Sequence, residues 1–174
     1  MGGSASEGPR KGRGHLARSR RAVHDRARMS RPPPGARADY RRFVPVTTRW
    51  GDNDVFGHVN NAVYYGYIDT AVTTLMLRAG VLNWTGSPHI VMVAEGGCRF
   101  HSEVGFPGQV QAGVRIARLG GSSIRHEVGM FRGDEDMASA EGFIVHVCVD
   151  SATRRPAPLP DEWRRALQPL VIEG

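Results

Sequence analysis

The sequence predicts an α+β fold in which an antiparallel sheet wraps around one long central helix. One observation is a single stretch of helical periodicity over residues 61–79. The other is a series of alternating apolar segments separated by short glycine-containing turns. A lone helix between strands can bury its apolar stripe only against the sheet that those strands form. The length of 174 residues suits one domain of ordinary size.

The predicted helix has one continuous apolar stripe. Its apolar residues recur at spacings of three and four, which places them on one face: Tyr64, Ile68, Ala71, Val72, Leu75, Met76 and Ala79. Asn60 or Asn61 can cap its start, and Gly80 can supply the left-handed residue that ends it. Nineteen residues make a rod of roughly 28 Å, which is long enough to run across a sheet.

Five segments are predicted as strands. Residues 43–49 suit an edge strand because Pro45 lacks a backbone donor. Apolar and polar residues alternate over 110–117 and 124–130, whereas 143–149 is apolar on both faces and should be central. An earlier strand is expected over 90–102. The short links favour antiparallel hairpins, and a closing helix is expected over residues 161–167.

Positive charge is concentrated near the N-terminus. Residues 1–42 hold twelve Lys and Arg against three acidic residues, and they contain almost no large apolar side chains. Such a segment cannot bury enough surface to offset its ordering entropy, so residues 1–40 are expected to be a disordered basic extension and 41–174 a single domain. A nucleic-acid arm, an organelle transit peptide and an extension of no consequence are all compatible with it. An extension of no consequence is the favoured interpretation, and a nucleic-acid partner is not expected.

Cysteine usage and hydropathy indicate the compartment. Cys98 and Cys148 lie fifty positions apart without CxxC spacing, which argues against a disulfide scaffold and favours a reducing environment. No run approaches the ~18 apolar residues that a membrane helix needs. We therefore expect a cytoplasmic protein without membrane association.

The turn Asp52–His58 is the candidate site. A calcium loop is excluded because Phe56 and Val63 stand where such a loop needs oxygen ligands, and Asp54 with His58 lacks a third metal ligand nearby. A carboxylate ahead of a helix N-terminus lies close to unpaired backbone N–H groups, which can bind a developing oxyanion. Taken alone, however, Asp52 and Asp54 are more typical of residues that shape a turn.

A resemblance favours the catalytic interpretation. The segment Arg49–Tyr65 contains D-x-D-x-x-G-H-V-N-N-x-x-Y, which resembles the signature of the 4-hydroxybenzoyl-CoA thioesterase-like branch of the hotdog superfamily. The turn at residues 119–123, the strand at 145–150 and the proline-rich segment at 155–160 also look similar, in the same order. The resemblance covers about residues 43–168. It implies a hotdog fold, hydrolysis of acyl-CoA thioesters without metal or cofactor, and a homodimer that can double to a tetramer.

The resemblance also implies roles for individual residues. Asp54 matches the catalytic carboxylate, either as nucleophile or as the general base that activates water. The carbonyl oxygen would be held by N–H groups around His89 and Ile90 and at the helix N-terminus. Further substrate contacts are expected at Gly57, His58, Val59, Asn60 and Tyr64, and coenzyme A contacts at Ser122, Ser123 and Arg125. The sequence Phe100–Glu103 replaces the family's tyrosine and proline, so the acyl preference stays open.

Two other functions fit part of the pattern. A hotdog enoyl-CoA hydratase also uses aspartate and histidine, but within a GDxNPxH pattern that this chain lacks. A non-catalytic acyl-CoA-binding protein would keep the fold, but it would not need the carboxylate of Asp54. The sequence leaves open whether coenzyme A or a carrier protein bears the acyl group.

Overall fold

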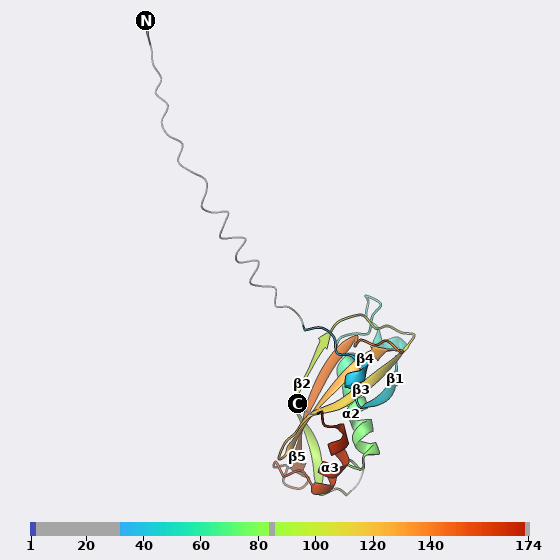
Figure 1. Ribbon diagram of the computed structural model, residues 1–174, viewed down its shortest axis with the longest axis vertical. Helices are drawn as coiled ribbons and strands as arrows, with labels where there is room; N and C mark the ends of the chain where they lie inside the picture. The colour runs from blue at the N-terminus through green and yellow to red at the C-terminus, as the bar shows by residue number, and fades with distance from the viewer. Residues whose placement is uncertain (3–31, 84–85, 173–174) are drawn as a thin grey trace. The chain divides into compact units, whose positions relative to one another are not determined.

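A five-stranded antiparallel sheet and one long helix form the core (Figure 1). The structure is a computed structural model that describes residues 1–2, 32–83 and 86–172, and residues 34–174 form one compact unit. The long helix α2 contacts all five strands, which confirms the predicted α+β fold. The elements are β1 (Arg42–Thr47), α2 (Val63–Arg78), β2 (His89–Phe100), β3 (Gln109–Leu119), β4 (Ser123–Arg132), β5 (Ala140–Asp150) and α3 (Asp161–Leu167).

Helix α2 is slightly shorter than expected at both ends. It begins at Val63 because Asn60 forms a turn first: the Ala62 N–H donates to Asn60 Oδ1 at 2.9 Å. At the other end, Gly80 adopts φ +71° and its N–H donates to the Leu77 carbonyl at 3.1 Å. The predicted stripe is buried from Tyr64 to Met76.

The sheet supplies the other half of the core. Alternate residues of β4 and β5 face α2, and the side chains of Ile124, Val128 and Met130 are fully buried there. Burying each such side chain contributes about 1.5–3 kcal/mol. The apolar face of the sheet, packed against the apolar stripe of α2, therefore contributes much of the stability of the domain.

The order of the strands differs from a simple meander. β1 is an edge strand and β5 is internal, as predicted, but β2 pairs with β5 instead of with its neighbour in sequence, β3. The glycine-rich link after β2 therefore crosses between the two sides of the sheet and is not a hairpin. β5 is internal because both of its backbone edges are paired, one with β4 and the other with β2.

The segment from Gly35 to Tyr40, which was expected to belong to the extension, packs on the outer face of the sheet. Tyr40 packs into the space that two glycines leave on this face. A Cβ on Gly113 would lie 2.8 Å from the Tyr40 Cβ, and a Cβ on Gly129 would lie 2.5 Å from the Tyr40 ring. The ring of Tyr40 also packs edge-on against Phe131 at 5.4 Å between centroids. The ordered domain thus begins before residue 41. The disorder expected for residues 3–31 lies outside the described residues.

No helix in the described ranges is long and apolar enough to span a membrane. The longest, α2, has sixteen residues, which corresponds to about 24 Å.

Candidate active site

The loop between β1 and α2 is built around a buried carboxylate. Asp52 is only 3% exposed, and its carboxylate accepts hydrogen bonds from the Arg49 N–H at 2.7 Å and from the Tyr67 hydroxyl at 2.6 Å. Burial opposes ionisation of Asp52, but these hydrogen bonds outweigh it and hold the pKa of the carboxyl below its usual value. Asp52 therefore fixes the loop to α2 and is not available to a substrate.

The second acid of the motif lies in a tight turn. Asp54 Oδ1 accepts the Phe56 N–H at 2.9 Å, and the Asp54 backbone N–H donates to the His58 carbonyl at 2.9 Å. Gly57 adopts φ +83°, which a residue with a side chain rarely does. The turn is thus closed by its own backbone, and the Asp54 carboxylate is half-buried at the rim of a pocket.

This pocket, of about 450 Å³, lies beside the start of α2. Its polar lining comes from Asp54, His58, Asn61, Ser102 and Glu103, and its apolar lining from Phe56, Val59, Tyr64 and Phe100. Tyr64 packs edge-on against Phe100 at 5.1 Å between ring centroids, and burial raises the pKa of its hydroxyl to about 12. A carboxylate and an imidazole thus face a partly aromatic cavity, an arrangement suited to acid–base or nucleophilic attack on an acyl group.

The loop that follows β2 carries the opposite wall of the pocket. The Val59 N–H donates to the Val104 carbonyl at 2.7 Å, and the Phe106 N–H donates to Asn53 Oδ1 at 3.1 Å. Between the same two loops, His58 Nε2 lies 2.9 Å from Glu103 Oε2. The two loops therefore form one unit.

Several residues expected to touch the substrate meet in this unit. Asp54, His58, Val59 and Tyr64 line the pocket, and Gly57 shapes the same turn. The side chain of Asn60 accepts the Ala62 N–H and so closes a turn just ahead of α2. It is not the predicted helix cap, because the N-cap position is Ala62 and no described side chain accepts a hydrogen bond from the first turn. The remaining expected contacts lie elsewhere in the chain.

His89 and Ile90 lie at the other end of β2. They pair with Asp150 and Val149, whereas the pocket residue Phe100 ends the same strand eleven residues later, roughly 36 Å away. The ring of His89 packs against Trp163 of α3 at 6.3 Å between centroids. Within one chain, the N–H groups of His89 and Ile90 are therefore not beside Asp54, whereas the N-terminus of α2, the other expected source of donors, borders the same pocket.

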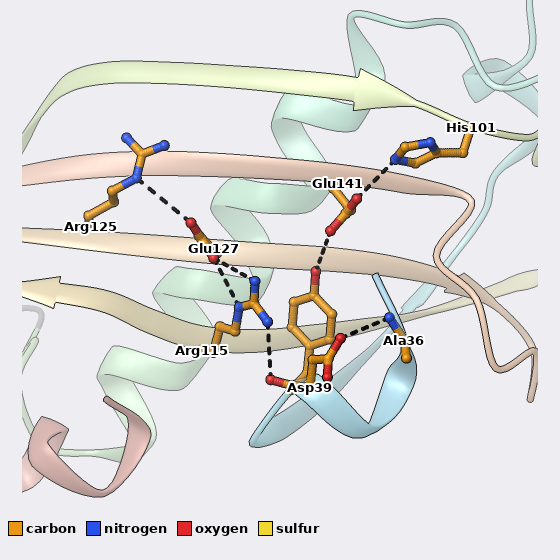
Figure 2. Close-up of polar contacts among 8 residues, drawn as sticks. Ala36, Asp39, His101, Arg115, Arg125, Glu127 and Glu141 are labelled. Atoms are coloured by element: carbon orange, nitrogen blue, oxygen red, sulfur yellow. Dashed lines mark hydrogen bonds and ion pairs between the residues drawn. The ribbon is translucent and has the colours of Figure 1, made fainter. Parts of the chain in front are cut away.

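The expected coenzyme A contacts also lie at that far end. Ser123 is opposite Val147 of β5, which pairs with Met92 near the start of β2. Figure 2 shows Arg125 on the sheet with Glu127 and Arg115. The Arg125 guanidinium lies 3.8 Å from the centroid of the Phe143 ring and its Nε 3.9 Å from Glu127 Oε1. Arg125 is thus held on the sheet by neighbours in its own chain.

Sequence reasoning gave no site role to Tyr67, Asn61, Ser102 or Phe100. Tyr67 could have been found, because it lies three residues after Tyr64 and so on the same side of the helix. Phe100 and Ser102 reach the pocket only because β2 lies beside β5 and not beside β3, which the sequence did not indicate. Among the described residues, no group of three or more His, Cys, Asp or Glu could hold a metal ion.

An antiparallel sheet around one long helix, with an acidic motif ahead of that helix, is the architecture of the hotdog fold. Residues 48–167 match the family described as the Thioesterase-like superfamily, and the chain belongs to that family. The comparison with curated proteins gave no match.

Solved structures agree with this assignment. The PA5185 protein of Pseudomonas aeruginosa strain PAO1 is 41% identical, with a TM-score of 0.77 over 80% of this chain and 97% of that one. The PA2801 protein of Pseudomonas aeruginosa is 29% identical, with a TM-score of 0.66 over 71% and 95%. Slr0204, a 1,4-dihydroxy-2-naphthoyl-CoA thioesterase from Synechocystis, is 14% identical with a TM-score of 0.64 over 72% and 94%, a likeness of fold alone.

Proposed function

We propose that this protein hydrolyses acyl-CoA thioesters to the free acid and coenzyme A, with Asp54 as nucleophile or general base. The observation that carries the proposal is the position of Asp54: the second acid of the family motif lies in the pocket wall at the entrance to α2. Its Oδ1 is occupied by the Phe56 N–H, which leaves Oδ2 to act on the substrate.

The chemistry is the same in outline for either role of Asp54. As general base, Oδ2 removes a proton from water while the water oxygen bonds to the carbonyl carbon and the C–S electron pair moves to sulfur. As nucleophile, Oδ2 itself bonds to that carbon while the C–S electron pair moves to sulfur, and water then hydrolyses the anhydride between Asp54 and the acyl group. Both routes consume one water and release one thiol.

We infer that the complete site needs a second copy of the chain. One edge of β2 has no strand beside it in the described part of the chain, and its middle exposes two apolar side chains, with Met92 46% and Val93 58% exposed. Two copies that pair antiparallel about the middle of β2 would place His89 of one opposite Phe100 of the other. The N–H groups near His89 and Ile90, together with Ser122, Ser123 and Arg125, would then approach the Asp54 pocket of the second copy.

The proposal also covers the cellular compartment and the cofactor requirement. The free thiols of Cys98 and Cys148 fit a reducing compartment, so we propose action in the cytoplasm. No step of the proposed reaction uses a metal or redox cofactor. The pocket's aromatic lining by Tyr64 and Phe100 supports an apolar acyl group.

Replacement of the Asp54 carboxylate tests the function directly. We expect Asp54→Asn to lower the release of thiol from acyl-CoA by ~10²-fold or more, with unchanged thermal stability. A panel of short, medium, long and aromatic acyl-CoA thioesters serves as substrate. The matched control is Asp134→Asn, which alters an exposed turn carboxylate outside the pocket and should keep full activity. An undiminished rate in Asp54→Asn would overturn the assignment.

A further inference from the structure

The pocket holds a contact between a histidine and a carboxylate that has no role in the proposed reaction so far. His58 Nε2 and Glu103 Oε2 are 2.9 Å apart, and both side chains line the same pocket as Asp54. When the Nε2–H donates to Glu103, Nδ1 is the ring nitrogen that remains for another partner. The pair therefore fixes which edge of the imidazole can meet a substrate.

The backbone around Glu103 is held firmly in place relative to the motif turn. Val104, the next residue, accepts the Val59 N–H at 2.7 Å, so the residues after His58 and Glu103 are joined directly. Close packing continues at Gly105, where a Cβ would lie 3.2 Å from the Gly57 carbonyl oxygen. These contacts fix the backbone beside Glu103, whereas the Glu103 side chain itself is 72% exposed and is held by its contact with His58.

The other side of this loop is anchored to the outer face of the sheet. His101 Nε2 lies 2.9 Å from Glu141 Oε2 (Figure 2). The Tyr40 hydroxyl donates to the other oxygen of this carboxylate, Glu141 Oε1, at 3.1 Å. The N–H groups of His101 and Ser102 both donate to the Ser139 carbonyl, at 2.8 and 2.9 Å. Glu103 thus extends from a backbone that is fixed on both sides.

We propose that Glu103 is a positioning residue that holds His58 so that Nδ1 faces the thioester sulfur, and that His58 protonates the departing thiolate. The inference rests on the proposed thioesterase function. As the C–S bond breaks, its electron pair goes to sulfur, and sulfur takes the Nδ1 proton of the His58 imidazolium. His58 is left neutral. In the general-base route it regains a proton when Asp54 Oδ2 gives up the one that it took from water, and in the nucleophile route it takes the proton from the water that hydrolyses the anhydride. Asp54 needs no change of role for this step.

An alkyl thiolate is a poor leaving group, whereas an aryl thiolate is stable enough to depart without a proton. The experiment therefore measures kcat/KM for one acyl group on a series of thiols from alkyl, including coenzyme A, to electron-poor aryl thiols. We expect His58→Gln to lower the rate with coenzyme A by ~10²-fold or more, and Glu103→Gln by ~10-fold or more. Both losses should shrink to less than about threefold with the best aryl leaving groups, so the dependence on thiol pKa becomes steeper.

Two further variants separate positioning from structure. The double variant His58→Gln/Glu103→Gln should be no slower than His58→Gln alone, because Glu103 acts through the imidazole. Glu162→Gln, an exposed carboxylate on α3, is the matched control and should change nothing. Equal losses on alkyl and aryl thioesters, or additive losses in the double variant, would overturn the inference. In contrast, Asp54→Asn with full activity across the whole series would overturn the proposed function itself.

Discussion

The hydroxyl of Tyr67 donates to Asp52 Oδ2 at 2.6 Å, and this contact ties the middle of the motif loop to the central helix. Burial and the Asp52 carboxylate both raise the pKa of Tyr67, so the hydroxyl stays a donor. The Asp52 carbonyl also accepts the Asn60 N–H at 2.8 Å, which closes the loop around the turn that carries Asp54. The position of the candidate catalytic carboxylate therefore depends on a neighbour that is not itself in the pocket lining.

Removal of the Tyr67 hydroxyl should loosen this loop. We expect Tyr67→Phe to lower the free energy of unfolding by about 1.5–3 kcal/mol, the range for a hydrogen bond to a charged group. Urea unfolding monitored by circular dichroism measures the change. Tyr65→Phe is the matched control, because Tyr65 is exposed on the same helix and should change stability by less than about 0.5 kcal/mol. Equal effects of the two substitutions would contradict the role assigned to Tyr67.

Two buried histidines between the sheet and α2 predict a dependence of stability on pH. The ring centroids of His126 and His146 are 5.4 Å apart. Burial is the main cause that lowers the pKa of His126 to about 3, and the charge of nearby His146 is the second cause. Burial also lowers the pKa of His146, which Asp69 of α2 partly offsets. In the unfolded chain both rings bind a proton near pH 6.5.

The sign follows from proton binding. As pH falls from about 6.5 towards 3, the unfolded state takes up protons that the folded state does not accept, so stability decreases. We expect a loss of about 1.4 kcal/mol per pH unit from His126. His146 should add a loss in the same direction, because its pKa is also lowered. Denaturant midpoints measured from pH 7.5 to 5 provide the test. His126→Leu/His146→Leu should flatten the curve, and an unchanged slope in that variant would assign the effect to other groups.

Truncation should show which part of the segment before β1 stabilises the domain. Removal of residues 1–33 is expected to leave the melting temperature unchanged. Removal of 1–40 takes away Tyr40, whose ring packs on Phe131, and should cost about 3 kcal/mol or more. Tyr40→Ala in the full chain should reproduce most of that loss. Indistinguishable melting temperatures for the two truncations would show that the outer face does not need this segment.

The proposed dimer predicts that a charge on β2 changes the oligomeric state. We expect Val93→Asp to shift the molar mass measured by light scattering towards that of one chain, and to lower thiol release with it. Val55→Asp alters a valine outside β2 that is exposed even more, at 94% against 58% for Val93, and it should leave the mass unchanged. A dimer that persists in Val93→Asp would place the interface elsewhere.

The sequence by itself determined the elements and the family. Helical spacing from Tyr64 to Met76 and alternation in 124–130 needed only local periodicity, because these residues bury one face whatever their partners are. The motif from Asp52 to Tyr65 identified the candidate carboxylate in the same way, since the motif is contiguous. The end of α2 at Gly80 was also predictable from the sequence, because glycine readily adopts the positive φ that ends a helix.

Only the tertiary structure decided which segments meet. Strand pairing depends on contacts between residues far apart in the chain, so periodicity did not reveal that β2 lies beside β5. That pairing brings Glu103 to His58 and takes His89 away from Asp54, and it leaves one edge of β2 without a partner strand among the described residues. Tyr40 has no apolar neighbour in sequence that would mark it as buried, and the two glycines it covers lie on strands that the chain reaches much later.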